Sequence, residues 1–187
     1  AGLDVRHVVE NMLYGVDIDP RNAIVANAIL GEGKYNTNIE VTDSLKKEWN
    51  MIFDHNLVVV GNPPYMGQEK SQKTSRFSEA SDKRKWEKFY KTFFRSADYA
   101  AVVLPSSWLG RLNDPMRKDL HADKHIEYII DVTPYFDKKK VTYDTLALIR
   151  NKEFSSDIKN VIRSNGHQHK ILATEIKSLR NTDETNV

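Results

Sequence analysis

Four consecutive residues, Asn62-Pro63-Pro64-Tyr65, follow an apolar, β-branched stretch, and their types point to chemistry on a planar amine. Two prolines in succession fix the backbone angles and remove two amide donors, so the Pro63 carbonyl has no ladder to join. Asn62 adds a side-chain oxygen that accepts hydrogen bonds, and Tyr65 adds a flat aromatic face. A rigid turn without function is the alternative, but a plain turn needs neither the amide nor the ring.

The chemistry that suits this corner is methyl transfer to an aromatic amine such as adenine N6. That nitrogen is a poor nucleophile because its lone pair is delocalised into the ring. The Asn62 side-chain oxygen and the Pro63 carbonyl could each accept one N–H, which would favour a pyramidal nitrogen with a free lone pair. No strong base is needed beforehand, since the proton becomes acidic only once the methyl is attached. Tyr65 would stack on the base and hold it in line.

Two aspartates end two other expected strands upstream of the corner. An acidic side chain at the end of a strand in a nucleotide-binding sheet, such as Asp17, can accept hydrogen bonds from both ribose hydroxyls. Asp43, within Val41–Leu45, could accept a hydrogen bond from the exocyclic amine of an adenine ring. Each has a plain alternative, because Asp17 could simply help to cap the next helix and Asp43 could be a solvated turn residue.

Alternating helix and strand signals indicate that an α/β domain positions these residues. Apolar runs predict strands at Met12–Asp17, around Ile39 and Val41, and at Asn56–Val60, Tyr99–Leu104, His125–Asp131 and Thr145–Arg150. Asp19-Pro20 and Asp114-Pro115 each combine a helix N-cap with proline in the first turn. Strands separated by helices indicate crossovers and a mostly parallel sheet, whose ligands bind beyond the carboxyl ends of the strands.

A stripe of large apolar side chains recurs at helical spacing before the Tyr99–Leu104 strand. Its members are Trp86, Phe89, Tyr90, Phe93, Phe94 and Ala97. This spacing places them on one face of a helix, and we interpret that face as core rather than as a stacking platform. The preceding stretch, Met66–Ser81, is polar and irregular, and loops of that length are uncommon unless they are functional or disordered.

The composition is that of a globular protein of one domain, with 187 residues, of which 40% are hydrophobic and 29% charged. A net charge of +2 neither requires nor excludes a nucleic-acid partner. The chain has no cysteine and no apolar run near the roughly 18 residues of a membrane span. We expect a cytoplasmic protein without membrane contact. We also expect no metal site, because His167 and His169 stand without other ligands.

Together these motifs resemble the gamma-class N6-adenine DNA methyltransferases, which include restriction–modification enzymes. The NPPY corner is similar to that family's catalytic motif, and the resemblance covers about residues 14–150. YGVDIDP resembles the ribose-binding motif, which implies Asp17 on the cofactor ribose and Ile18 against the cofactor adenine. VTDSL resembles the next motif, which implies cofactor contacts by Asp43 and Ser44, with Asp43 on the adenine amine.

The resemblance implies a Rossmann-like fold that uses S-adenosylmethionine to methylate an adenine flipped out of double-stranded DNA. FDKKKV is similar to a later motif in which an aromatic side chain packs on the extruded base. Phe136 would then join Tyr65 as a second stacking partner, with Tyr135 as the alternative aromatic and core packing as the plain interpretation of Phe136. The basic triplets Lys83–Lys85 and Lys138–Lys140 could contact phosphates, or could simply be solvated faces.

The sequence departs from the family at the front of the cofactor site. A glycine-rich Asp-Pro-x-x-Gly-x-Gly loop is expected upstream of YGVDIDP, but only Ala1–Leu13 precede that motif. We therefore expect a catalytic core over residues 1–150 that is truncated on its N-terminal side, followed by a polar extension over 151–187. The sequence is either an excerpt of a longer protein or a chain that has lost cofactor binding.

The motif leaves the substrate open, because NPPY also serves enzymes that methylate RNA bases or the glutamine amide of a protein. The aromatic-plus-lysine segment after Tyr135 and the basic loop favour DNA. A non-catalytic fragment or subunit that needs a partner chain is the alternative from another class. The expected partners are double-stranded DNA and either the remainder of a longer chain or a restriction or specificity subunit.

Overall fold

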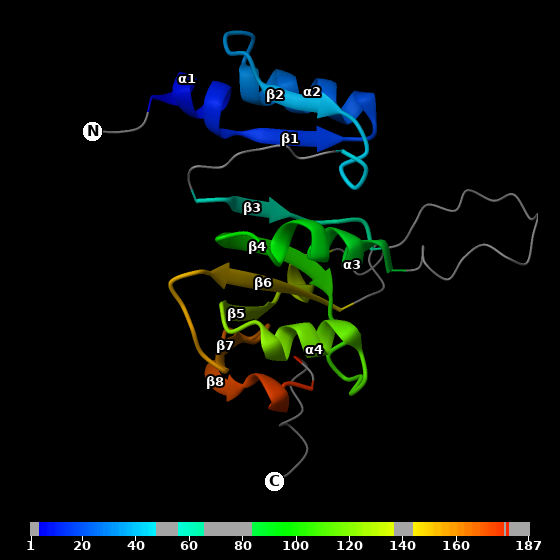
Figure 1. Ribbon diagram of the computed structural model, residues 1–187, viewed down its shortest axis with the longest axis vertical. Helices are drawn as coiled ribbons and strands as arrows, with labels where there is room; N and C mark the ends of the chain where they lie inside the picture. The colour runs from blue at the N-terminus through cyan, green and yellow to red at the C-terminus, as the bar shows by residue number, and fades with distance from the viewer. Residues whose placement is uncertain (1–3, 48–55, 66–83, 137–143, 178, 180–187) are drawn as a thin grey trace, which may run out of the picture. The chain divides into compact units, whose positions relative to one another are not determined.

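The computed structural model describes residues 4–47, 56–65, 84–136, 144–177 and 179. The chain divides into two compact units, one over residues 1–52 and one over residues 53–187 (Figure 1). The predicted loop at Met66–Ser81 and the lysines Lys138–Lys140 lie outside the described residues.

The first unit is a two-stranded parallel sheet with one long helix. Its elements are α1 (Val5–His7), the π-helix η1 (Val8–Met12), β1 (Tyr14–Asp17), α2 (Pro20–Gly31) and β2 (Asn38–Val41). β1 and β2 run in parallel, with Asp17 opposite Val41. The start of α2 confirms the prediction from the Asp-Pro pair, since the Asp19 carboxylate accepts a hydrogen bond from the Arg21 N–H (2.9 Å) and Pro20 occupies the first turn.

The second unit holds a six-stranded sheet in the order β3-β4-β6-β5-β7-β8. Its strands are β3 (Val58–Gly61), β4 (Tyr99–Pro105), β5 (Ile126–Asp131), β6 (Thr145–Asn151), β7 (Ile158–Ile162) and β8 (Gln168–Leu172). Its helical segments are α3 (Lys85–Phe89), the π-helix η3 (Tyr90–Phe94), α4 (Pro115–Ala122), and the short 3-10 helices η4 (Thr133–Tyr135) and η5 (Ala173–Glu175).

The six-stranded sheet is mixed, which corrects the expectation of a mostly parallel sheet. β3 pairs with β4 in parallel, and β5 pairs with β7 in parallel. β6 lies antiparallel between β4 and β5, and β8 lies antiparallel to β7. β6 is the next strand after β5 in the chain and pairs beside it in the opposite direction. Apolar periodicity predicts a strand but carries no information on its direction.

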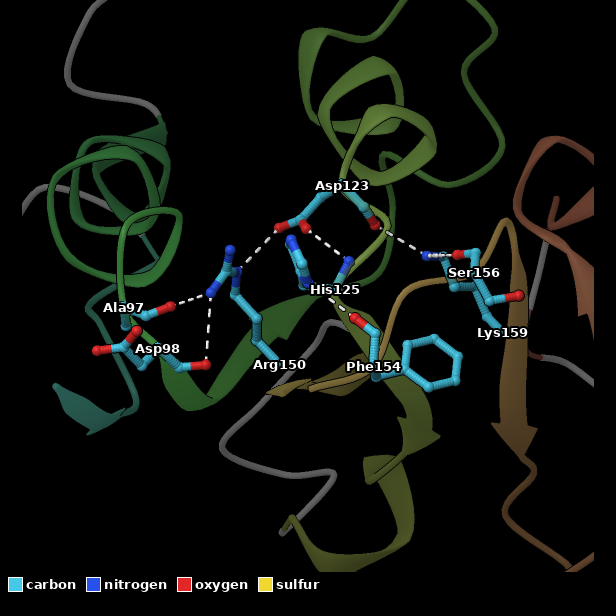
Figure 2. A network of polar contacts seen from close by, with 8 residues as sticks. All are labelled: Ala97, Asp98, Asp123, His125, Arg150, Phe154, Ser156 and Lys159. Atoms are coloured by element: carbon cyan, nitrogen blue, oxygen red, sulfur yellow. Dashed lines mark hydrogen bonds and ion pairs between the residues drawn. The ribbon is translucent and has the colours of Figure 1, made fainter. Parts of the chain in front are cut away.

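The sheet also continues beyond residue 150, where the sequence predicts a polar extension. β6 runs to Asn151, and β7 and β8 add two further strands. The inward positions of β7 are Lys159 and Val161, both fully buried, so the apolar alternation that normally reveals a strand is interrupted by a lysine. The Lys159 ammonium donates to the carbonyls of Asp123 (2.8 Å) and Ser156 (2.7 Å), and burial lowers its pKa (Figure 2).

The core of the second unit confirms the interpretation of the aromatic stripe. Trp86, Tyr90, Phe94 and Ala97 are all buried, and the rings of Trp86 and Trp108 lie 6.4 Å apart between centroids. Members of this core also come from β4, α4, β5 and β6, so the helices and the sheet share one continuous hydrophobic cluster. That cluster holds the strand ends in place for the candidate site.

Candidate functional site

The carboxyl ends of β3, β4, β5 and β7 meet at one edge of the six-stranded sheet, because these four strands run in the same direction. The Asn62–Tyr65 corner follows β3 at this edge, and the turn that carries Phe136 follows β5. Two strands, β4 and β6, separate them in the sheet order. At about 4.8 Å per strand, β3 and β5 are roughly 14 Å apart, so both segments lie along one edge.

The Asn62–Tyr65 corner leaves the sheet immediately after Gly61, which pairs with Val102 of β4. Pro63 is buried, whereas Asn62 and Pro64 are exposed. Within the described part of the chain, no residue forms a hydrogen bond with the Asn62 side chain, so its amide oxygen retains its acceptor capacity. The corner therefore combines a fixed, partly buried backbone with an accessible acceptor.

Gly61 was not singled out from the sequence, yet it sets how closely the core approaches the corner. A Cβ atom added to Gly61 would lie 3.2 Å from Cζ of Phe94 in η3, which is tighter than an ordinary contact. Phe94 is buried in the main hydrophobic cluster. The corner thus begins directly against the aromatic core, and the small size of glycine permits this approach.

Tyr65 is partly buried, and its ring packs against the hydrophobic cluster. Burial raises the pKa of Tyr65 to about 12, further above neutral pH than that of an exposed phenol. Its hydroxyl is buried and has no hydrogen-bond partner among the residues that the structure describes. A ligand can therefore contact only the part of the Tyr65 ring that is not packed against the core.

The turn after β5 presents two neighbouring aromatic residues. Phe136 is partly buried, whereas Tyr135 is 85% exposed. The backbone N–H of Phe136 donates to the Thr133 carbonyl (3.2 Å), which closes the short helix η4. The structure therefore places both aromatics at the carboxyl edge of the sheet, and Phe136 is the less exposed of the two.

Asp17 lies at the carboxyl end of β1 in the first unit, and its carboxylate accepts two hydrogen bonds. Oδ1 accepts the Asp19 N–H (2.8 Å), and Oδ2 accepts the Asn22 side-chain amide (3.1 Å). Asp17 thus stabilises the turn into α2, in keeping with the plain interpretation, while each of its oxygens retains a further lone pair. Ile18, the next residue, is 68% exposed.

Asp43 lies two residues after β2, at the same edge of the first unit as Asp17. The Thr42 N–H donates to the Asp17 carbonyl (3.0 Å), which joins the two strand ends. Oδ1 of Asp43 accepts the Leu45 N–H (3.1 Å), so Asp43 begins a turn that also includes Ser44. The four predicted cofactor residues thus share one edge of the first unit, while the NPPY corner and Phe136 lie in the second.

Arg84 is held by acidic partners, and its contact with phosphate stays a prediction. Its guanidinium donates to both carboxylate oxygens of Asp114 (3.0 Å each) and pairs with Glu87. It also lies 5.0 Å from the centre of the Trp86 ring. Its positive charge is therefore paired with two carboxylates of the same chain.

No helix in the described ranges is long and apolar enough to cross a membrane. In the same ranges, no group of three or more histidine, aspartate and glutamate side chains is arranged to hold a metal ion.

Comparison with known proteins places this architecture among restriction–modification methyltransferases. The sequence profile of the Eco57I restriction-modification methylase family matches residues 28–137, which is more than half of the chain. No curated protein matches the sequence significantly.

Several solved structures of restriction–modification proteins share the fold. The methyltransferase subunit of a type I restriction-modification system from Streptococcus thermophilus is 21% identical, with a TM-score of 0.55 over 80% of this chain and 36% of that one. The M protein of the type I restriction enzyme EcoKI is 18% identical, with a TM-score of 0.57 over 83% and 36%. The type IIL enzyme MmeI, solved in complex with DNA, is 15% identical, with a TM-score of 0.54 over 85% and 27%.

The chain spans about a third of the length of these proteins, or less. At such identities the likeness shows the fold and leaves the chemistry to the residues themselves.

Proposed function

Because the chain belongs to the Eco57I restriction-modification methylase family, we propose that it methylates the N6 amine of an adenine flipped out of double-stranded DNA. S-adenosylmethionine supplies the methyl group. The reaction would serve a restriction–modification system in the cytoplasm, together with the remainder of a longer chain or a restriction or specificity subunit.

One observation carries the proposal. The Asn62 side chain stands exposed at the carboxyl end of β3, without a hydrogen-bond partner among the described residues, on a backbone held by buried Pro63. An amide oxygen left open at this edge is suited to accept an N–H from a ligand. A turn with a purely structural role would be expected to use that oxygen to satisfy its own backbone.

The chemistry follows from the two acceptors. The Asn62 oxygen and the Pro63 carbonyl each accept one N–H of the adenine amine, which localises the nitrogen lone pair for attack on the methyl group. As the new C–N bond forms, the bond between the methyl group and the cofactor sulfur would break, and the sulfur would keep the electron pair as a neutral thioether. The methylated amine would then lose its proton to solvent, so no basic residue is needed at the start. Tyr65, a neutral phenol whose pKa burial raises further to about 12, offers the free part of its ring to the base.

Stacking helps to offset the energy of extracting the base. Flipping a base from the duplex costs a few kcal/mol, and stacking on an aromatic side chain contributes roughly 1–3 kcal/mol per base. Tyr65 and Phe136 both lie at the carboxyl edge of the same sheet. Two partly buried rings would therefore recover much of the energy of extrusion.

The residues of the first unit fit the adenosine part of the cofactor. Asp17 and Asp43 place two carboxylates at one edge, where spare lone pairs can accept a ribose hydroxyl and the adenine amine. Ile18 adds an exposed apolar side chain beside them for the adenine face. Ser44 follows Asp43 in the same turn and is assigned to the same ligand.

The test uses the full-length protein with labelled S-adenosylmethionine and DNA, transfer RNA or a glutamine peptide as acceptor. Label is expected in DNA, at adenine N6. Asn62→Ala should lower the rate of transfer by about 100-fold or more, the effect of removing one positioned hydrogen-bonding group. Cofactor affinity, measured by calorimetry, should stay nearly unchanged.

Two matched variants make the result specific. Asn62→Asp retains an acceptor oxygen and should be more active than Asn62→Ala, while Asn113→Ala removes an exposed amide before α4 and should behave as wild type. Label in RNA or peptide but not in DNA would overturn the substrate assignment. Equal loss of transfer and cofactor binding in Asn62→Ala would indicate a folding defect.

A further inference from the structure

The turn that carries Phe136 is anchored by a side chain that the sequence does not mark as functional. After Asp131, β5 leaves the sheet through η4, in which the Tyr135 N–H donates to the Val132 carbonyl (3.0 Å). This bond occupies the Val132 carbonyl, which in a continued strand would accept a hydrogen bond from a backbone N–H of β6. The chain can therefore turn toward Phe136 only if another acceptor replaces it.

The Thr133 hydroxyl is that replacement. Thr145, the first residue of β6, is fully buried, and its backbone N–H donates to Thr133 Oγ1 (3.0 Å). The same hydroxyl donates to the Thr145 carbonyl (3.1 Å). The Thr145 carbonyl also accepts the Val132 N–H (3.2 Å), so the Thr133 hydroxyl replaces the missing ladder acceptor for the Thr145 N–H and adds a second donor to its carbonyl.

The backbone of Thr133 is itself fixed from both sides. Its N–H donates to Oδ1 of Asp131 (3.0 Å), and its carbonyl accepts the Phe136 N–H (3.2 Å). A shift of Thr133 would therefore carry directly to Phe136, three residues along the chain. Pro134 further restricts the turn between them.

We propose that Thr133 is a positioning residue, whose hydroxyl fixes the turn that presents the Phe136 ring to the flipped base. This inference rests on the proposed function and adds to it a residue that determines how firmly the base is held. Thr133 does not touch the base. It acts by keeping the η4 turn in one conformation, so that Phe136 is ready to stack when the base arrives.

The test compares Thr133→Val with Thr133→Ser in the full-length protein. Valine has nearly the same shape but removes both hydrogen bonds to Thr145, whereas serine keeps the hydroxyl. Thr133→Val should lower kcat for DNA methylation roughly tenfold, an effect of the order of lost base stacking. The KM for S-adenosylmethionine should not change, and Thr133→Ser should restore activity close to wild type.

A double-mutant cycle with Phe136→Ala separates positioning from general stability. If Thr133 acts through Phe136, Thr133→Val should cause no further loss of kcat once the ring is absent. Ser156→Ala is the matched control, because it removes a comparable side-chain bond to the Ile158 N–H (3.0 Å) at the opposite edge of the sheet. Its kcat should equal that of wild type.

Two results would overturn the inference: unchanged kcat in Thr133→Val, or an equal loss in the presence and absence of the Phe136 ring. Should Thr133→Val fail to fold, Pro134→Gly loosens the same turn at an exposed position and must show the same dependence on Phe136. A wild-type protein that methylates no DNA would instead contradict the proposed function.

Discussion

The same Asp-Pro pair begins one helix in each unit, and the two pairs have very different surroundings. Asp19 caps α2 and pairs with Arg21, whose side chain is 87% exposed. Asp114 caps α4 and binds Arg84 through both oxygens, with only 3% of its side chain exposed. One local motif is thus a solvated cap in the first unit and part of a buried polar cluster in the second.

The contrast extends to the apolar side chains. In the second unit a continuous cluster buries residues from four strands and three helical segments. In the first unit the described buried residues are Val9, Ala23 and Gly31, while Ile24, Val25 and Ile29 of α2 are exposed. Local capping and turn bonds therefore contribute a larger share of the order in the first unit, and core packing dominates in the second.

The largest expected effect comes from removing matched aliphatic side chains. Leu104→Ala, in the fully buried part of β4, should lower the free energy of unfolding by about 2–5 kcal/mol, because it leaves a cavity in the core. Ile29→Ala, at a position 67% exposed, should change it by less than about 0.5 kcal/mol. Urea unfolding measures the change in unfolding free energy of each variant. Equal losses would contradict the contrast between the packed second unit and the first.

An intermediate effect is expected from Asp114→Ala. It removes a cap bond to the Met116 N–H (3.0 Å) and leaves the Arg84 guanidinium without its two acceptors. We expect a loss of about 2 kcal/mol in unfolding free energy, from the cap together with the two lost bonds to Arg84, which keeps only its pair with Glu87. Asp114→Asn keeps an acceptor for the cap and should lose less. A loss in Asp114→Asn as large as in Asp114→Ala would show that the ion pair alone matters.

The smallest effect is expected from Asp19→Ala, because its partners lie in solvent. The hydrogen bond from the Arg21 side chain, followed by that from its backbone N–H, lowers the pKa of Asp19. A lowered folded-state pKa contributes stability above the ordinary carboxyl pKa of about 4, and this is lost as the pH falls through the lowered value. Circular dichroism of the wild type should show that loss only in acid, and Asp19→Ala should lack it. A dependence on pH near neutrality would contradict this account.

Particular residues show how far sequence reasoning reached. The Asp-Pro pairs, the Trp86–Ala97 stripe and the six expected strands are all present in the structure, with strand ends shifted by up to two residues. These features are encoded by neighbouring residues, so periodicity and capping rules detect them. The sequence did not predict β7, because Lys159 occupies an inward position of the strand. Its ammonium is satisfied there by two carbonyls outside the strand (Figure 2).

In the candidate site, too, some features follow from neighbouring residues and others depend on tertiary packing. The placement of Asn62 at a strand end and the approximate position of Phe136 could be inferred from the order of motifs along the chain. The closeness of Gly61 to Phe94 could not, because it depends on how η3 packs on β3. The assignment of Asp17 and Asp43 to the cofactor and of Asn62 to the amine stays a prediction.

The sequence by itself determined six of the strands, the Asp-Pro starts of two helices, the core face of the Trp86–Ala97 stripe and the place of Asn62 directly after a strand. Each of these depends on residues within one or two turns of each other. Only the tertiary structure decided the direction of β6, the pairing of Arg84 with Asp114 and the bonds between Thr133 and Thr145. Those features need groups distant in sequence to meet, and their bonds form because burial leaves each polar group no water to bind.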